Sequence, residues 1–121
     1  MKSLARIRKR HGRCYELAVH AMIYESESDQ WTLVHGRLDL SIALGRTGLK
    51  GWYDHAWIEL DDGRIYDPVH NDYTPATIYI AKWHAVVDHR YSRREMSCLI
   101  STTRNSGPWT DDERRASVSQ R

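Results

Sequence analysis

Three residues have the types and the order needed for catalysis by a thiol nucleophile: Cys14, His55 and Asp67. In such chemistry a thiolate attacks an acyl carbon, an imidazole takes and returns the proton, and a carboxylate holds the imidazole in place. The thiolate is favoured at a helix N-terminus, where free amide groups carry partial positive charge. The chain could therefore form a Cys-His-Asp triad if its elements bring these side chains together.

The first helix is expected to begin at or near Cys14. In "CYELAVHAMIYESES" apolar residues recur at the i, i+3, i+4 spacing of a helix, and Gly12 just before it can make a sharp turn. Cys14 then falls in the first helical turn, where the amide groups and the nearby Arg10 and Arg13 favour its thiolate form.

His55 and Asp67 belong to a predicted β-hairpin, "WYDHAWIELDDGRIYDPV", over residues 52–69. Asp61-Asp62-Gly63 suits a three-residue connection with the glycine in the left-handed region, which forms a G1 bulge. This connection opposes Leu60 to Arg64, Trp57 to Asp67 and His55 to Val69.

The length of that turn decides whether the pair can meet. With three residues, side-chain alternation places His55 and Asp67 on one face as diagonal neighbours, and Ala56, Ile58 and Leu60 on the other. A two-residue Asp-Gly turn would shift the register by one and separate the pair. The catalytic interpretation therefore needs the longer turn. Taken alone, Asp67 before Pro68 is also a common turn former.

The remaining segments predict a mixed fold. Residues 31–40 favour a strand, 70–76 a loop, and 77–89 one long strand or two strands joined by a bulge. "SRREMSCLISTT" opens with Ser92 and has Glu95 three residues later, a capping box typical of a helix start.

This order predicts an α+β domain in which the Cys-bearing helix packs on an antiparallel sheet, with a further helix toward the C-terminus. We expect one domain over residues 1–109, with a basic arm at 1–13, and a disordered polar tail over 110–121.

The overall composition and net charge exclude few other classes of function. The 121 residues carry a net charge of +2, so bulk charge does not require a nucleic-acid partner, and only the basic arm would support one. No apolar stretch is long enough to span a membrane, and no secretory signal is evident. We expect a soluble, cytoplasmic protein without a membrane partner, whose two cysteines stay reduced.

"GRCYELA", followed by "DHAWIELDDGRIYDP", resembles the transglutaminase-like superfamily of papain-like cysteine enzymes over residues 12–69. The resemblance implies a Cys-bearing helix on an antiparallel sheet that carries the histidine and the aspartate. Cys14 would be the nucleophile, His55 the general base and acid, and Asp67 the orienting carboxylate. The family often has tryptophan after its cysteine, where this chain has Tyr15. Small bacterial and phage proteins and lasso-peptide leader peptidases share the pattern, so the resemblance indicates chemistry rather than substrate.

The expected activity is that of a peptidase or amidase that acts on a polypeptide or another amide through a thioester acyl-enzyme, without a cofactor. The Cys14 amide is the default oxyanion donor, with His11 or Tyr15 as the second. Aromatic side chains could line the substrate groove, although at least two of those on the strands should be core instead. The candidates are Tyr15, Trp31, Trp52, Tyr53 and Trp57.

Other interpretations remain open. An amine acceptor would make the enzyme an acyl transferase, and the same fold without turnover would be a binding module or a phage-like inhibitor. The seven histidines make a metal site the second enzyme-like possibility, but their spacings match no H-E-x-x-H or Cys/His zinc pattern, so no metal is expected. Cys98 with His84 or His89 is an alternative pair, but Cys98 lies in mid-helix, away from the amides that favour a thiolate.

Overall fold

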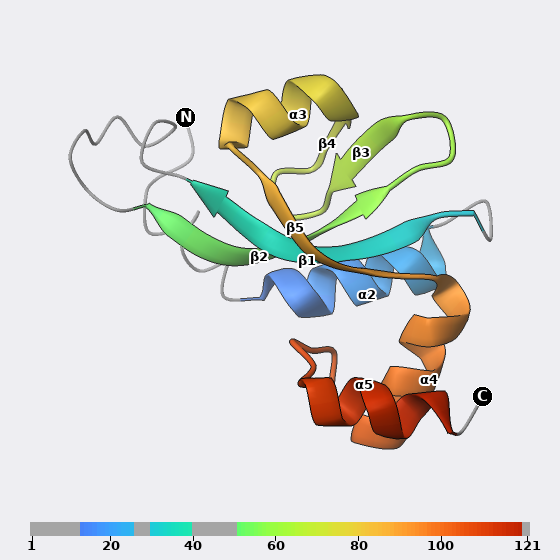
Figure 1. Cartoon of the computed structure of the whole chain (residues 1–121). Helices are drawn as coiled ribbons and strands as arrows, with labels where there is room; N and C mark the ends of the chain where they lie inside the picture. Colours follow the sequence, from blue (N-terminus) through green and yellow to red (C-terminus); the bar gives the residue numbers. More distant parts are fainter. Residues whose placement is uncertain (1–12, 26–29, 40–50, 120–121) are drawn as a thin grey trace.

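The computed structural model describes residues 13–25, 30–39 and 51–119, which contain four helices and five strands (Figure 1). The helices are α2 (Cys14–Tyr24), α3 (Ala76–Trp83), α4 (Arg93–Thr103) and α5 (Asp111–Val118). The strands are β1 (Thr32–Asp39), β2 (Trp52–Glu59), β3 (Arg64–Asp67), β4 (Asp72–Pro75) and β5 (Val86–Tyr91). The basic arm, apart from Arg13, lies outside the described residues, as does His11.

The strands form one antiparallel sheet in the order β4-β3-β2-β1-β5. Helix α2 covers one face and α3 the other, while α4 and α5 lie on the α2 side (Figure 1). This arrangement confirms the expected α+β class with an antiparallel sheet. Each helix of the described residues is too short or too polar to cross a bilayer.

Both faces of β2 are buried from His55 to Ile58, which agrees with the apolar run Ala56-Trp57-Ile58. Ala56 and Ile58 pack with α2 and α4 in one core, and Trp57 packs with α3 in a second core on the opposite face. Side chains alternate along a strand, so His55 shares the α3 face with Trp57.

The hairpin has the predicted three-residue connection. The Leu60 N–H donates to the Arg64 carbonyl oxygen at 2.8 Å, and Gly63 has φ of 86°, in the left-handed region. The paired residues Ile58 and Tyr66 continue this register. The local turn chemistry was therefore sufficient to place the two strands correctly.

The prediction of one or two strands over 77–89 was half wrong, because residues 76–83 form α3 and only Val86–Tyr91 is a strand. Tyr79 and Trp83 are both buried at i, i+4 spacing, so helical periodicity outweighs their high strand propensity. Pro75 precedes the helix as its N-cap residue. The expected loop over 70–76 also contains the short strand β4.

Residues 111–118 of the C-terminal tail form a helix where disorder was expected. Helix α4 has the predicted capping box between Ser92 and Glu95, and α5 has a second one between Thr110 and Glu113. Ser117 on α5 is fully buried, and Trp109 before it is 4% exposed. The low hydrophobicity of this segment concealed a helix that is started by its cap and held by a few buried contacts.

Candidate active site

His55 and Asp67 meet in the interior, as the hairpin register predicted. His55 Nε2 lies 2.9 Å from Asp67 Oδ2, and both side chains are fully buried. Asp67 is the last residue of β3, and His55 is in the middle of β2, beyond the point where the two strands stop pairing. A buried ion pair of this kind is retained only where its polar atoms find partners.

Further donors surround the Asp67 carboxylate. The Tyr79 hydroxyl donates to Oδ2 at 2.5 Å, and His70 Nδ1 lies 2.7 Å from the same oxygen. Oδ1 accepts the backbone N–H of Val69 at 3.0 Å and that of His70 at 3.4 Å. Asp67 therefore organises the turn after β3 and also holds His55.

These contacts keep Asp67 ionised. Burial alone would raise the pKa of its carboxyl, but the charge of His55 and the hydrogen bonds from His55 and His70 outweigh burial and hold that pKa well below its usual value. Sequence reasoning did not identify His70 and Tyr79 as partners of Asp67. His70 lies in the predicted loop, and Tyr79 in a segment predicted to be a strand.

Cys14 begins α2, and its sulfur lies against the backbone of β2 on both sides of His55. Its Sγ is 3.9 Å from the Asp54 carbonyl oxygen, and a hydrogen bond from the Ala56 backbone acts on the thiol. The Leu60 N–H points to β3, and the backbone groups of every second residue of a strand point to the same edge. The backbone N–H and carbonyl groups of Ala56 and Asp54 therefore also point to the β3 edge of β2.

Strand β3 does not pair with β2 at Ala56 and Asp54, because the pairing of the two strands ends at Ile58 and Tyr66. The sulfur therefore occupies the side of β2 that a longer β3 would have covered. This position places the thiol beside the strand edge rather than over the centre of the α2 face. The short β3 thus creates room at the backbone of His55.

The resting state of Cys14 differs from the expected thiolate. Burial raises the pKa of the Cys14 thiol to about 11, although the amides of Ala56, Tyr15 and Cys14 itself lower it. The helix N-terminus acts in the predicted direction, but the loss of water around a side chain only 1% exposed is the larger effect. Arg13, which was expected to assist, is exposed and pairs with Glu16 instead.

The aromatic candidates divide between core and surface. Trp31 and Trp57 are buried in the two cores, so Trp57 does not line a groove, contrary to the expectation for it. Strand alternation directs Trp57 under α3. Trp52 is 49% exposed, and Tyr53 packs against the α3-side core. Tyr15 lines a pocket of about 340 Å³ beside the cysteine.

The cluster around Asp67 also has donor atoms that suit a metal ion. Single ligand atoms of His55, Asp67 and His70 all lie within 4.8 Å of one another. Two imidazoles and one carboxylate are a common ligand set for zinc. In this structure the same atoms are joined by hydrogen bonds, and the sequence spacing alone did not reveal the grouping.

The alternative cysteine is poorly placed. Cys98 lies inside α4 and is half-buried, and α4 packs on the α2 side of the sheet. His84 ends α3 on the opposite side, so the sheet separates it from Cys98. His89 lies on β5 and lines the pocket beside Tyr15.

The fold and the site together define an α+β protein with a buried imidazole-carboxylate pair next to a buried cysteine. Comparison of the chain with protein-family models, with curated proteins and with solved structures finds no match.

Proposed function

We propose that this protein is a cysteine-dependent hydrolase, a peptidase or amidase of the papain-like, transglutaminase-like type. One observation carries the proposal: the Cys14 sulfur contacts the backbone on both sides of His55, whose ring is held by the buried Asp67. The proposed nucleophile, base and orienting group lie on α2, β2 and β3, and their convergence supports the proposal.

The hydrogen bond to Asp67 defines the tautomer of His55. Because the carboxylate is ionised, His55 Nε2 carries a proton and donates it, and in the neutral form of the ring the lone pair is on Nδ1. In the proposed reaction, Nδ1 takes the thiol proton while Sγ attacks the carbonyl carbon of the substrate. The imidazolium then protonates the leaving amine, and a thioester remains on Cys14.

Water completes the cycle. His55 accepts a proton from water, the resulting hydroxide attacks the thioester, and the acid product leaves as the thiol is re-formed. The high pKa of Cys14 means that the thiol is neutral at rest, so proton transfer accompanies attack rather than preceding it. Because the thiol is 1% exposed, the groups around it must move for a substrate to reach it.

Covalent trapping tests the proposal. The full chain is incubated with a peptide carrying a vinyl sulfone group, and the adduct is mapped by mass spectrometry. We expect labelling of Cys14 that is lost in Cys14→Ala, strongly reduced in His55→Gln and unchanged in Cys98→Ala. Labelling that persists in Cys14→Ala, or that is indifferent to His55→Gln, would contradict the mechanism. Release of an acid, rather than formation of a new amide when an amine is added, separates hydrolysis from acyl transfer.

A metal site is the second candidate, favoured by the grouping of His55, Asp67 and His70. A metal ion on His55 Nε2 would replace the proton that Asp67 now accepts, and the ring would be fixed as a ligand. Zinc titration of the purified protein, with His70→Gln as the control, distinguishes the two. Stoichiometric zinc that is lost in His70→Gln, without any Cys14 adduct in the wild type, would favour a metalloprotein. Absence of both would leave the binding-module interpretation.

A further inference from the structure

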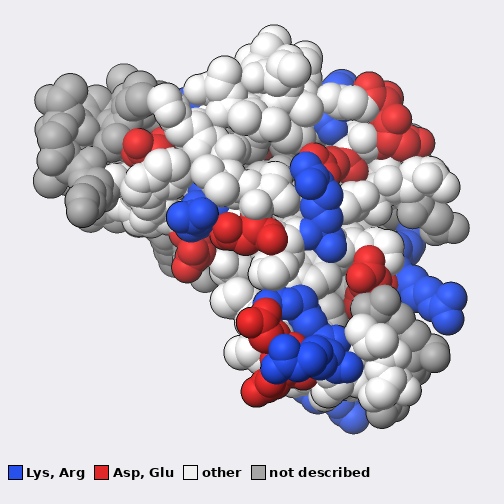
Figure 2. Space-filling view, viewed as in Figure 1, with Lys and Arg blue, Asp and Glu red and all other residues white. Residues whose placement is uncertain are grey.

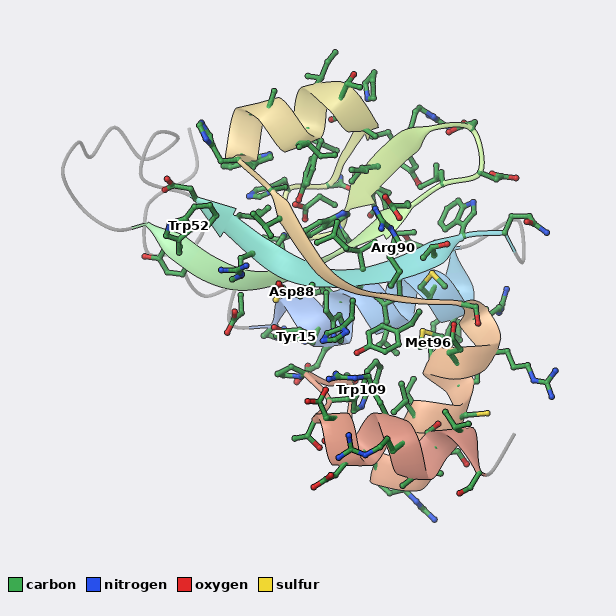
Figure 3. The ribbon with its side chains drawn as sticks, in the orientation of Figure 1. Tyr15, Trp52, Asp88, Arg90, Met96 and Trp109 are labelled. Carbon is green, nitrogen blue, oxygen red and sulfur yellow. The ribbon has the colours of Figure 1, made fainter. Side chains whose placement is uncertain are left out.

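The pocket next to Cys14 lies between the sheet and the segment that leads into α5. Its walls come from the start of α2, from β1, β2 and β5, and from residues before and within α5. Figure 3 shows Tyr15 and Trp109 on either side of this space, with Asp88 above Tyr15. The pocket has a volume of about 340 Å³, within the range of small-ligand sites.

The pocket adjoins the thiol through two of its residues. Tyr15 follows Cys14 in α2, and the backbone oxygen of Asp54 is the atom 3.9 Å from Cys14 Sγ. The pocket therefore borders the two residues that adjoin the sulfur, Tyr15 and Asp54, although Cys14 itself, 1% exposed, does not line it.

Of the aspartate and arginine side chains that line the pocket, one is exposed and pairs with no side chain among the described residues. Arg114 is engaged by Asp111, by the Tyr91 hydroxyl and by the Trp109 carbonyl oxygen. Asp88 accepts two hydrogen bonds from Arg37, each of 3.3 Å.

Asp54, by contrast, is exposed, and its carboxylate pairs with no side chain among the described residues. Its charge reaches Tyr15, whose pKa it helps to raise after the larger effects of burial and of Cys14. The pocket thus has at its rim a negative charge that pairs with no side chain of the described ranges, on the residue whose backbone oxygen contacts the thiol. Positive and negative side chains are mixed on the face of the molecule shown in Figure 2. Any preference for a cationic ligand would therefore be a local property of the pocket.

The inner wall is aromatic and neutral. His35 is 5% exposed, with its ring stacked on Trp109 and edge-on to Tyr15 and Tyr91 at centroid distances of 4.7 to 5.1 Å. Burial lowers the pKa of His35 to about 4, so it adds no positive charge at neutral pH. Its Nε2 has no hydrogen-bond partner within the described part of the chain. This nitrogen is itself buried, so it is not open to a group bound in the pocket.

We propose that this pocket binds the cationic side chain of an arginine or lysine residue next to the scissile amide. The aliphatic part of that side chain packs on Tyr15, the charge faces Asp54, and aromatic rings on the inner wall favour a cation over an anion. The position next to the scissile bond rests on the proposed hydrolase function, whereas cation binding itself does not.

Binding is measured first, without turnover. The full-length Cys14→Ala variant is titrated with N-acetyl-arginine amide and N-acetyl-lysine amide, followed by NMR, and with the neutral N-acetyl-citrulline amide. We expect saturable shifts with the two cationic amides, and binding weaker by about tenfold for citrulline, a change of about 1.4 kcal/mol. Asp54→Asn should weaken the cationic amides by a similar factor, and Asp61→Asn, an exposed aspartate of the hairpin turn, should not. Equal affinity for arginine and citrulline amides, or no effect of Asp54→Asn, would overturn the proposal.

Turnover is measured second, with peptides that differ only in that residue. A preference for arginine or lysine that Asp54→Asn removes, and Asp61→Asn keeps, supports cation recognition beside the scissile bond. Hydrolysis with no such preference overturns the proposed specificity but leaves the hydrolase function standing. Asp54-dependent binding without hydrolysis of any peptide has the opposite meaning: the pocket binds cations, and the proposed function fails.

Discussion

The buried carboxylate of Asp67 offers the sharpest test of how this site is held together. In Asp67→Asn the negative charge is lost, and an amide cannot accept from every group that now donates to the carboxylate. Three side-chain donors meet at one oxygen, from His55, His70 and Tyr79. With the side-chain NH₂ of the Asp67→Asn variant in the position of Oδ2, this NH₂ would face the three side-chain donors. With the amide flipped, the NH₂ would take the position of Oδ1 and face the Val69 N–H.

The cost follows from this geometry. Removing one partner of a buried ion pair typically lowers the free energy of unfolding by about 3–5 kcal/mol. In Asp67→Asn, neither orientation of the amide can accept from all the donors that now face the two carboxylate oxygens. For a chain of this size the melting temperature should fall by roughly 10 °C or more. Asp61→Asn, an exposed aspartate of the same hairpin, should change the free energy of unfolding by less than about 0.5 kcal/mol.

The pH dependence gives an independent check. The pKa of Asp67 is lowered in the folded protein, so its contribution to stability is complete above the unfolded value of 3.8. As the pH falls below that value, the unfolded chain takes up a proton that the folded protein resists. The difference in stability between wild type and Asp67→Asn should therefore be constant from pH 7 to about 5 and shrink below pH 3.8.

Urea unfolding followed by tryptophan fluorescence measures both effects. An Asp67→Asn variant as stable as the wild type would refute the argument that the carboxylate holds the site together. A stability difference that does not shrink in acid would show that the lowered pKa of Asp67 is not its cause.

Two further predictions concern the sheet and the pocket. A Cβ on Gly36 would lie 2.1 Å from the Val86 carbonyl oxygen and 2.6 Å from the Trp57 ring, so Gly36→Ala should cost about 3 kcal/mol or more in urea unfolding. Gly63→Ala, in open space at φ of 86°, should cost only the backbone strain of about 1–2 kcal/mol, and equal losses would contradict the packing argument. The lowered pKa of His35 predicts that stability declines between pH 6.5 and 4, because only the unfolded chain is protonated there; a His35→Gln variant that declines equally would refute this.

The hairpin shows what local chemistry can predict. The residues Asp61-Asp62-Gly63 specify a turn of one length, that length sets the register, and the register places His55 and Asp67 on one face. The start of α2 at Cys14 was equally local, because helical periodicity and a preceding glycine marked it. The antiparallel α+β class followed from these elements, whereas the strand order did not.

Other features depend on what each segment packs against. The segment with Tyr79 and Trp83 has strand-forming residues but folds as a helix because both aromatic rings reach the same core. The capping box at Thr110 and Glu113 was readable, yet the polar composition of the tail led to a prediction of disorder.

The ionisation state of Cys14 could not be predicted from the sequence for a different reason. Helix amides and burial act on the thiol in opposite directions, and only the packed structure shows that burial is the larger effect.

The helical pair α4 and α5 has a separate consequence. Helix α5 supplies Arg114 to the pocket and the link between the two helices supplies Trp109, but this segment supplies none of Cys14, His55 and Asp67. The residues that would make and break bonds and those that would choose a substrate thus come partly from different stretches of the chain. In the proposed enzyme, substrate selectivity could accordingly be changed by replacing the last thirty or so residues, while the elements that carry Cys14, His55 and Asp67 stay the same.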